Sequence, residues 1–381
     1  MNILIIPSWY PTEENPTAGI FFKEQAIALK EMGLNPIVIY PKIESLKTFK
    51  KNIGAEIVKN IEEGVPTLRL TTYNYLPKIP LGGSMVFWKA IKKLYKEVLK
   101  DYGRPDIIHA HSCLWAGEAA RRLSIQESIP FVLTEHSSVV GKQNISRLQK
   151  MVIGKILNQS NHIISVGPGL AKSLEELTPN QGISIIPNIV DIDFFDMSFK
   201  DSNEKKFKFF SLALLNKNKG MDVLIKAFAK YLRDSNVELI IGGDGEEKAN
   251  LERLIADLGI SSQIKLIGAL DRFRVKEEMQ KCDSFVLASR YETFGVVFIE
   301  ALACGRPIIA TKCGGPEMIV EKNNGYLVEV DDIDGLGKAM LSMIKNINYY
   351  HDTIIRKQCI EKFSKEVVIK QIKDVYKLKV K

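Results

Sequence analysis

This sequence of 381 residues lacks several features that would define its class at once. Its five cysteines lie far apart and form no Cys-x-x-Cys pair, which argues against a zinc site or a redox motif and favours reduced thiols in the cytosol. No apolar run is long enough to span a membrane, and the short apolar start has no basic residues before it, unlike a signal peptide. We therefore expect a cytoplasmic protein whose contact with a membrane, if it has one, is peripheral.

The composition is that of an ordinary globular protein, and the length exceeds what one hydrophobic core usually organises. Hydrophobic residues make up 45% of the chain and charged residues 26%. The net charge of +8 favours a polyanionic partner: nucleic acid, an anionic membrane surface or a phosphorylated ligand. Charge does not choose among these, but the motifs below point to a phosphorylated ligand and none of them to nucleic acid.

Short apolar runs alternate with segments of helical period in both halves of the chain, with a polar stretch between them. Alternation of this kind predicts a parallel sheet with helices on both faces. We predict an α/β protein with two Rossmann-like, doubly wound domains facing each other across a cleft. The predicted parts are an N-terminal domain at 1–190, a linker at 191–206, a C-terminal domain at 207–360, and a terminal helix at 361–381 that packs on the first domain.

The most informative stretch is "SRYETFGVVFIEALACGRPIIATKCGGPEMIV", residues 289–320. It reads as a loop after a strand, a helix, a glycine and the next strand, so that backbone N–H groups at the helix start form a seat for phosphate. Gly295 lets a ligand approach that backbone closely. Glu292 in the loop and Glu300 on the helix can accept hydrogen bonds from hydroxyls on either side of the phosphate. This arrangement predicts a nucleotide sugar as ligand.

Two other interpretations apply to these glutamates. Their side chains would be about two helical turns and roughly 80° apart, a poor arrangement for a glycosidase acid and base. Alternatively, Glu292 only complements the helix dipole and Glu300 is a surface residue. Glu300 stands within "VVFIEALAC", where we expect a charge to be buried, and an unpaired buried charge costs several kcal/mol. The expected burial favours a functional role.

The same stretch resembles the Glu-x7-Glu signature of the retaining glycosyltransferases of family 4, which have the GT-B fold of two Rossmann-like domains. Other stretches agree with that family: "SWYPTEENPTAGIFFKEQAIALKEMG", "PDIIHAHS", "IPFVLTEHS", "IIPNIVD", "NKGMDVLIKAF" and "NNGYLVEVDD". The resemblance covers most of the chain and is weakest at 42–104. It implies a metal-independent hexosyltransferase without a cofactor. Uridine is the default base of the donor and guanosine the second choice, although no residue decides between them.

The resemblance also implies roles for individual residues. Glu292 contacts the transferred sugar, Glu300 holds the ribose, and Lys219 binds the donor phosphates. The backbone offered to the diphosphate belongs to Phe294, Gly295, Val296 and Val297. The position of the family's phosphate-binding arginine falls on Leu214, which is a departure from the pattern, and Lys217 is a candidate substitute. Both lysines have the alternative of being ordinary loop residues.

Two candidate residues lie in the first domain. Gly19 precedes a helix after a long loop, where its backbone could face the donor phosphates or the acceptor, or simply begin the helix. His136 ends the strand in "PFVLTEH", and the resemblance places a histidine there in the active site. A capping or core histidine is the alternative. His109 and His111 end a neighbouring strand, and without a third ligand at a recognisable spacing we interpret them as structural or acceptor-side residues.

Two features bear on metals and membranes. The Asp-Ile-Asp triplets at 191–193 and 332–334 suit a linker start and a helix N-cap, so we predict no metal site. Residues 87–102 place five lysines around an apolar stripe, which fits an anionic membrane surface or, more commonly, a solvated helix packed on the sheet. These lysines are Lys89, Lys92, Lys93, Lys96 and Lys100. Membrane binding would make a lipid-linked acceptor the natural choice.

The sequence thus predicts a retaining glycosyltransferase that moves a sugar from a nucleotide diphosphate sugar to a hydroxyl of a glycan or lipid-linked acceptor. Synthesis of cell-surface polysaccharide or glycoconjugate, at the inner face of the membrane, is the expected setting. A nucleotide-sugar epimerase or a sugar phosphorylase could share the fold. The departure at Leu214 also permits a non-catalytic partner subunit that binds a nucleotide sugar or a glycan.

Overall fold

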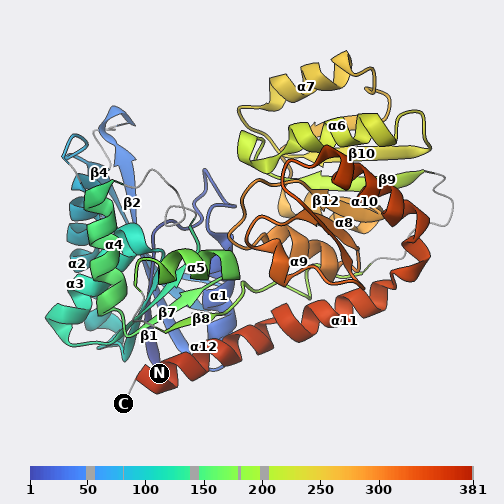
Figure 1. Ribbon diagram of the computed structural model, residues 1–381. Coiled ribbons are helices and arrows are strands. Elements are labelled where there is room, and N and C mark those ends of the chain that lie inside the picture. Colours follow the sequence, from blue (N-terminus) through green and yellow to red (C-terminus); the bar gives the residue numbers. More distant parts are fainter. Residues whose placement is uncertain (49–55, 80, 138–145, 179–181, 198–205, 380–381) are drawn as a thin grey trace. The chain divides into compact units, whose positions relative to one another are not determined.

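The computed structural model describes residues 1–48, 56–79, 81–137, 146–178, 182–197 and 206–379. Residues 198–205, most of the second half of the predicted linker, lie outside the described residues. The chain divides into two compact units. Unit 1 comprises Met1–Ile189 and Lys365–Lys381, and unit 2 comprises Val190–Ser364. Each unit has an α/β architecture of its own (Figure 1).

Unit 1 is built on a sheet in the order β3-β4-β2-β1-β5-β6-β7-β8. Its strands are β1 (Asn2–Pro7), β2 (Asn35–Ser45), β3 (Ile57–Glu62), β4 (Val65–Asn74), β5 (Ile107–His111), β6 (Phe131–Glu135), β7 (His162–Ser165) and β8 (Ile183–Ile185). Its helices are α1 (Ile20–Glu31), α2 (Gly82–Tyr102), α3 (Glu118–Glu127), α4 (Arg147–Gln159), α5 (Pro168–Glu175) and α12 (Lys365–Lys379). The central strands are almost wholly buried, as expected for parallel strands covered on both faces, and polar residues stand near the ends of β5 and β6.

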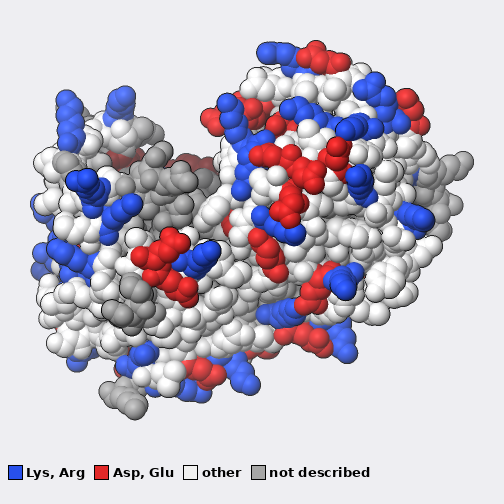
Figure 2. All heavy atoms as spheres, viewed as in Figure 1, with Lys and Arg blue, Asp and Glu red and all other residues white. Residues whose placement is uncertain are grey.

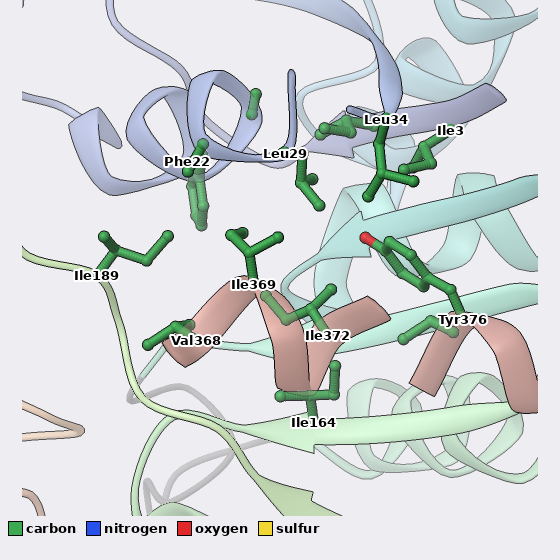
Figure 3. Packing of buried hydrophobic residues seen from close by; sticks show 14 of the residues in the cluster. Ile3, Phe22, Leu29, Leu34, Ile164, Ile189, Val368, Ile369, Ile372 and Tyr376 are labelled. Carbon is green, nitrogen blue, oxygen red and sulfur yellow. The ribbon is translucent and has the colours of Figure 1, made fainter. Parts of the chain in front are cut away.

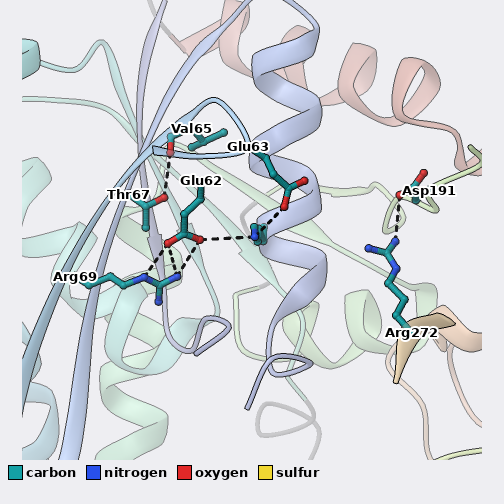
Figure 4. A network of polar contacts seen from close by, with 8 residues as sticks. Glu62, Glu63, Val65, Thr67, Arg69, Asp191 and Arg272 are labelled. Carbon is teal, nitrogen blue, oxygen red and sulfur yellow. Dashed lines mark hydrogen bonds and ion pairs between the residues drawn. The ribbon is translucent and has the colours of Figure 1, made fainter. Parts of the chain in front are cut away.

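The hairpin of β3 and β4 departs from the expected parallel sheet, since these two strands pair antiparallel. Glu63 and Gly64 form the two-residue turn between them, both with positive φ, as tight hairpins require. Arg69 on β4 binds the carboxylate of Glu62 through Nε and Nη2, at 2.8 to 3.1 Å, and Lys23 of α1 approaches Glu63 at 2.9 Å (Figure 4). The hairpin is therefore joined to the first helix through charged side chains.

The last helix of the chain, α12, belongs to the hydrophobic core of unit 1 (Figure 3). Val368, Ile369 and Ile372 are buried among residues of β1, α1 and β7, and Tyr376 is fully buried. The Tyr376 hydroxyl lies 2.5 Å from Nδ1 of His109 on β5. The C-terminal segment thus completes the unit that the N-terminus begins.

Unit 2 has a parallel sheet in the order β11-β10-β9-β12-β13-β14. Its strands are β9 (Phe207–Leu212), β10 (Val237–Gly242), β11 (Ile264–Gly268), β12 (Ser284–Leu287), β13 (Ile308–Thr311) and β14 (Gly325–Val328). Its helices are α6 (Met221–Tyr231), α7 (Lys248–Asp257), α8 (Arg272–Lys281), α9 (Val296–Ala303), α10 (Ile333–Lys345) and α11 (Asp352–Phe363). In chain order this arrangement is 3-2-1-4-5-6, the strand order of dinucleotide-binding Rossmann folds.

Two further observations concern both units. None of the helices within the described residues is long and apolar enough to cross a membrane. All five cysteine side chains are buried, and none of them forms a disulfide within the described part of the chain.

Candidate functional site

Both sheets reverse their strand order at one point, and ligands of open α/β sheets bind beyond the carboxyl ends of the strands there. In unit 2 this point lies between β9 and β12, and in unit 1 between β1 and β5. The loop after β9 carries Lys219 and the loop after β12 carries Glu292. In unit 1 the corresponding loops hold Gly19 and the residues that follow His111. The predicted residues therefore fall at these two edges, which we describe separately.

In unit 2, Lys219 and Glu292 form a close ion pair. The Lys219 Nζ lies 2.6 Å from Oε1 of Glu292, and the two side chains are 22% and 11% exposed. The Ser289 hydroxyl donates a second hydrogen bond to the same carboxylate oxygen, at 2.8 Å. Glu292 is thus held in place by two donors, one of them charged, while its side chain keeps some access to solvent.

The loops that carry this pair are joined through their backbones. The backbone N–H of Arg290 donates to the carbonyl of Asn218 at 2.7 Å, and the Asn218 side chain donates to the carbonyl of Tyr291 at 2.9 Å. Gly220 has φ of 61°, and a Cβ there would lie 1.9 Å from the carbonyl oxygen of Ala288. Only glycine fits this position, which holds the lysine loop against the glutamate loop.

The helix α9 begins directly after the glutamate loop. Gly295 is its N-cap in a left-handed conformation, and the first N–H groups of the helix have no partner within the helix by its geometry. Phe294 is buried and packs against Phe363. The loop after β13 approaches Phe294 so closely that a Cβ on Gly315 would lie 2.5 Å from its backbone. The start of α9 is therefore fixed by the packing of Phe294 on Phe363 and by the loop at Gly315. The first turn of the helix includes Val296 and Val297.

Glu300 departs from the expected burial. Its neighbours Ile299 and Ala301 are fully buried, but Glu300 itself is only partly buried. The expectation of a buried charge was wrong, because the helix turns the Glu300 side chain away from the core between those two residues. The argument for its function from the cost of buried charge therefore does not hold, and its contact with the ribose stays a prediction.

Leu214 and Lys217 lie in the loop after β9. The Leu214 side chain is 65% exposed, although the residues on either side of it are anchored. A Cβ on Gly243 would lie 1.9 Å from the carbonyl oxygen of Ala213, and one on Gly245 would lie 2.4 Å from that of Leu215. Lys217 is exposed and its carbonyl accepts a hydrogen bond from Arg290. The loop conformation is thus set by its backbone and not by the leucine side chain.

Arg290 is a residue of this site that sequence reasoning missed. Its guanidinium binds Asp222 at 3.1 Å and Asp331 at 2.8 Å, besides the carbonyl of Lys217. The Asp222 carboxylate holds the pKa of Arg290 above its usual value. Arg290 therefore connects three loops of unit 2 through its guanidinium. In the sequence, only its position two residues before Glu292 could have indicated a role at this site.

In unit 1, three histidines gather at the ends of β5 and β6. His109 lies between the hydroxyls of Tyr376 and Thr134, at 2.5 and 2.7 Å, which makes it a structural residue. His111 Nδ1 and His136 Nε2 are 3.1 Å apart, so one ring donates a hydrogen bond to the other. Burial lowers the pKa of His109 and of His136 to about 3 and that of His111 well below its usual value. The three rings are therefore neutral at neutral pH.

Glu135 is the second residue that sequence reasoning missed. Its side chain is 0% exposed and lies directly before His136. One carboxylate oxygen accepts from the backbone N–H groups of His136 and Ser137 and from the Ser137 hydroxyl, at 3.0, 2.7 and 2.7 Å. The other accepts from the backbone N–H of Cys113 at 2.6 Å. Backbone donors thus stabilise a fully buried carboxylate, a partnership that leaves no pattern in a sequence.

The turn that Glu135 holds has an unusual backbone. Ser112 and Trp115 both have positive φ, at 75° and 72°, which is uncommon for residues with a side chain. The Ser8 hydroxyl also donates to the carbonyl of Leu114 at 2.7 Å. Such a conformation persists only where surrounding contacts impose it. Glu135 and Ser8 supply those contacts from the ends of β6 and β1.

Gly19 is the N-cap of α1, with φ of 72°. A Cβ at this position would lie 2.8 Å from the Trp9 ring and 2.9 Å from the Phe22 ring. The Phe22 ring in turn packs on His111 and His136, with centroids 4.8 Å apart in both pairs. The glycine is thus explained by packing next to the histidines, and its contact with a ligand stays a prediction.

The two Asp-Ile-Asp triplets have ordinary partners. Asp332 is the N-cap of α10, as predicted, and accepts from the backbone N–H of Gly335 at 2.8 Å. Asp191 accepts from Arg272 at 3.3 Å (Figure 4). Over the described ranges, no group of three or more His, Cys, Asp or Glu side chains is placed to hold a metal ion.

Comparisons with known proteins agree with this geometry. The family model Glycosyl transferases group 1 matches residues 194–359, and Glycosyltransferase Family 4 matches residues 18–194. An uncharacterised glycosyltransferase of Methanocaldococcus jannaschii is 30% identical over 356 residues, which cover 90% of this chain and 97% of that protein. A putative teichuronic acid biosynthesis glycosyltransferase of Bacillus subtilis is 27% identical, covering 89% of this chain and 88% of its own.

Among solved structures, Anabaena HepE in complex with UDP and glucose matches with a TM-score of 0.74 and 19% identity. The match covers 99% of this chain and 100% of that one. The predicted GT-B class, an α/β fold of two Rossmann-like domains, is confirmed by this likeness.

Proposed function

The chain belongs to glycosyltransferase family 4, and on that premise we propose that it transfers a hexose from a nucleotide diphosphate sugar to a hydroxyl group with retention at the anomeric carbon. The observation that carries this proposal is the Lys219–Glu292 pair beside the first turn of α9. A cation and a carboxylate 2.6 Å apart match the junction of a sugar phosphate. In this proposal the donor phosphate forms an ion pair with Lys219, and the sugar hydroxyls donate hydrogen bonds to Glu292.

The diphosphate has two sources of stabilisation in unit 2. Lys219 supplies a positive charge, and the start of α9 supplies backbone donors at the positive end of the helix dipole. Fixed donors of this kind act most strongly on charge that develops as the donor bond breaks. In this proposal Glu300, one turn further along α9 and partly exposed, accepts hydrogen bonds from the ribose hydroxyls. Metal ions have no role in this proposal.

The hydrogen bonds that Glu292 already accepts bear on how the sugar is transferred with retention. Its Oε1 already accepts hydrogen bonds from Lys219 and Ser289, which lowers its tendency to attack the anomeric carbon. We therefore favour a substitution on one face of the sugar. The bond between the anomeric carbon and the phosphate oxygen breaks, the acceptor oxygen bonds to that carbon, and the acceptor proton passes to the leaving phosphate oxygen.

Unit 1 supplies the acceptor side in this proposal. His136 is buried and neutral, so that it offers the acceptor a hydrogen-bond donor or acceptor and no charge. A neutral polar partner suits a sugar hydroxyl, which is itself neutral until its proton leaves. Gly19, next to the same ring cluster, keeps the start of α1 close to this site.

The proposed setting is cell-surface glycan synthesis with a UDP-sugar donor at the cytoplasmic face of a membrane. Two relatives support it by name: one is a putative teichuronic acid biosynthesis enzyme, and the other is bound to UDP and glucose. Neither name decides between UDP and GDP for this chain. The acceptor would be a glycan or a lipid-linked glycan.

The helix α2 supports a peripheral membrane contact. Its apolar stripe is buried against β2 and β4, while its five lysines are exposed. Figure 2 shows basic side chains predominating at the edge of unit 1 where Figure 1 labels α2 and α3. Met85 and Leu99 add exposed apolar surface to the same helix. Clustered lysines next to apolar side chains are attracted to anionic lipid.

One observation favours a second candidate function. Leu214 is 65% exposed at the position that the family resemblance assigns to a phosphate-binding arginine. A donor site with one cation fewer would bind a nucleotide sugar more weakly and stabilise its leaving group less. A non-catalytic partner subunit that binds a nucleotide sugar or a glycan is therefore the alternative to an active transferase.

Thermal-shift measurements with UDP, GDP, ADP and their common sugars, with and without magnesium, test the donor site first. We expect one base to raise the melting temperature, without need of magnesium, because a ligand of the native state stabilises it. The shift should be lost in Lys219→Ala and kept in Lys281→Ala, which removes a lysine of α8 that pairs with Glu277 of the same helix. A panel in which no nucleotide raises the melting temperature would exclude the donor assignment.

Mass spectrometry of the products then separates the two candidate functions. Incubation of the wild type with the bound UDP-sugar and glycan or polyprenyl-phosphate acceptors should give a product heavier by one hexose. A nucleotide shift without any sugar transfer, together with loss of the shift in Glu300→Ala, would favour the non-catalytic candidate. Conversion of the donor alone into another sugar would indicate an epimerase.

A further inference from the structure

A hollow lined with tyrosines lies in unit 2 at the amino end of β14, the edge strand of the sheet. It encloses about 330 Å³, within the range of about 300 to 1,000 Å³ typical of small-ligand sites. Its walls are Lys322, Gly325, Tyr326, Asn346, Tyr349 and Tyr350. They come from the turn before β14, the strand itself and the segment after α10.

The tyrosine rings meet at steep angles and form a corner. The rings of Tyr349 and Tyr350 are 5.5 Å apart at 85°, and those of Tyr326 and Tyr350 are 6.2 Å apart at 75°. Tyr349 is 63% exposed, whereas Tyr350 is 6% exposed. The Tyr326 hydroxyl accepts a hydrogen bond from the Asn346 side chain at 3.4 Å. One open aromatic face thus stands beside fixed polar groups.

The backbone around this corner is fixed. The segment after α10 forms a short 3-10 turn, Ile347–Tyr349, in which the N–H of Tyr349 donates to the carbonyl of Asn346 at 2.9 Å. A Cβ on Gly325 would lie 2.0 Å from the carbonyl oxygen of Ile308, so glycine alone lets β14 begin here. The corner therefore exists before any ligand binds.

A second hollow of about 420 Å³ adjoins the first, because Tyr350 lines both. Its other walls are polar for the most part: Asp283, Arg306, Ile347, Asn348, His351, Asp352 and Thr353. A ligand longer than one ring could extend from the tyrosine corner past Tyr350 into this space.

These hollows lie at the amino ends of the strands, whereas the Lys219–Glu292 pair lies at their carboxyl ends. Asp283 directly precedes β12, whereas Glu292 follows it, and Gly325 is the first residue of β14. A strand of four residues spans about 13 Å. A single sugar bound at the corner therefore cannot reach the donor pair, and the corner is a separate site.

From the tyrosine corner, we propose that unit 2 carries a second, non-catalytic site for a saccharide chain. The exposed face of Tyr349 packs against the C–H face of a pyranose ring, and the amide and tyrosine hydroxyls hydrogen-bond to sugar hydroxyls. The described lining of the corner contains no carboxylate and one lysine, which suits a neutral or weakly acidic glycan. The purpose of the site rests on the proposed function: it holds the glycan that the transferase extends.

Saturation-transfer difference NMR tests the site without a donor. The probes are maltohexaose, chitotetraose and UMP, each measured with the wild type, Tyr349→Ala, Tyr349→Phe and Tyr102→Ala. Tyr102 is a matched control, an exposed tyrosine at the end of α2 in unit 1. We expect at least one of the two glycans to receive saturation from the wild type. Its signal should fall at least fivefold in Tyr349→Ala and stay within twofold in Tyr349→Phe and Tyr102→Ala.

The remaining outcomes count against the site. Equal glycan signals in the wild type and in Tyr349→Ala would overturn it, as would the absence of transfer to both glycans. A UMP signal that alone depends on Tyr349 would identify a nucleotide site in its place. Thermal melting serves as the folding control, because Tyr349 is largely exposed and its removal should leave the melting temperature unchanged. Failure of the proposed function would show separately, as a wild type whose melting temperature no nucleotide raises.

Discussion

Both α/β units reverse their strand order at one point, but the side chains at the carboxyl ends of their central strands differ in chemistry. At the carboxyl ends of β5 and β6, unit 1 places three neutral histidines and a carboxylate that is 0% exposed. At the carboxyl ends of β9 and β12, unit 2 places an ion pair whose members keep 22% and 11% exposure. The same scaffold thus supports a dry polar cluster of neutral imidazoles beside one buried carboxylate, and an ion pair that is partly hydrated.

Desolvation explains the difference. A buried imidazole loses its proton because the charged form cannot be solvated, whereas a lysine near the surface keeps its charge beside a carboxylate. A hydroxyl acceptor needs hydrogen-bond partners and exclusion of water, while a diphosphate needs fixed positive charge. The contrast between the units therefore matches the two halves of a transfer reaction, and it can be tested residue by residue.

The largest effect should come from removing the cation of unit 2. In Lys219→Ala the donor phosphates lose their charged partner and Glu292 loses its ion-pair partner. We expect kcat/KM to fall by about 10²- to 10³-fold, as for removal of one preorganised group that stabilises developing charge. Steady-state kinetics with the nucleotide sugar identified by thermal shift measures this decrease, and Lys281→Ala is the matched control. A decrease of less than threefold would show that Lys219 does not stabilise the donor phosphates during transfer.

The corresponding change in unit 1 should act on stability. Glu135→Gln replaces a carboxylate oxygen by an NH₂ group, which cannot accept from Cys113 or Ser137. We expect a loss of about 2 to 4 kcal/mol in the free energy of unfolding, because hydrogen bonds to a buried charge are strong and their donors would be left unpaired. Urea unfolding followed by tryptophan fluorescence reports on unit 1, since all three tryptophans, Trp9, Trp88 and Trp115, lie there.

An exposed glutamate provides the control for that comparison. Glu13→Gln removes the same charge from the same unit and should change the free energy of unfolding by less than about 0.5 kcal/mol. If Glu135→Gln were equally mild, the carboxylate would not be what imposes the strained turn at Ser112 and Trp115.

The histidines of unit 1 should make its stability depend on pH. The folded state holds their pKa values below the usual value of about 6.5, so the unfolded chain binds protons that the folded chain does not. Stability is therefore full above pH 7 and falls as the pH decreases through 6.5 toward 3. Between pH 7 and pH 6 the three rings together should cost about 2 kcal/mol.

The exposed His351 of unit 2 is the internal control for the pH experiment. Urea unfolding at pH 7 and pH 6 in His351→Gln should show the same decrease as the wild type. A tryptophan-detected stability that does not change over this range would mean that the histidine cluster of unit 1 takes up protons without unfolding.

The sequence predicted those parts of the molecule whose structure depends on residues close together in the chain. Apolar runs predicted the buried parallel strands, and the phosphate-seat argument expected a helix to start near Phe294–Val296. In the structure α9 begins at Val296, with Gly295 as its cap. Asp332 was read correctly as a helix cap because the cap lies within its own segment. The predicted GT-B class was confirmed for the same reason, since alternating strands and helices repeat along the whole chain.

Features that depend on distant contacts could not be read in this way. The β3 strand is largely exposed although half of its residues are apolar, so that only its pairing with β4 defines it. Glu135 owes its burial to backbone donors from a turn 22 residues away. Glu300 was expected to be buried from its apolar neighbours, but the rotation of α9 on the sheet, a tertiary property, leaves it partly exposed.

The smallest effect should come from adding a positive charge to unit 2 at Leu214. The loop around it is set by the close approach of Gly243 and Gly245, and its side chain is 65% exposed, so Leu214→Arg can add a cation to unit 2 without repacking. If the donor diphosphate lies at this edge, the new charge should raise kcat/KM by about 3- to 10-fold, a gain of about 0.7 to 1.4 kcal/mol. Leu341→Arg, an exposed leucine of α10, should change nothing and controls for net charge. An effect that disappears at 0.5 M salt in both variants would indicate long-range attraction alone, whereas a gain kept at high salt in Leu214→Arg would place the diphosphate against this loop.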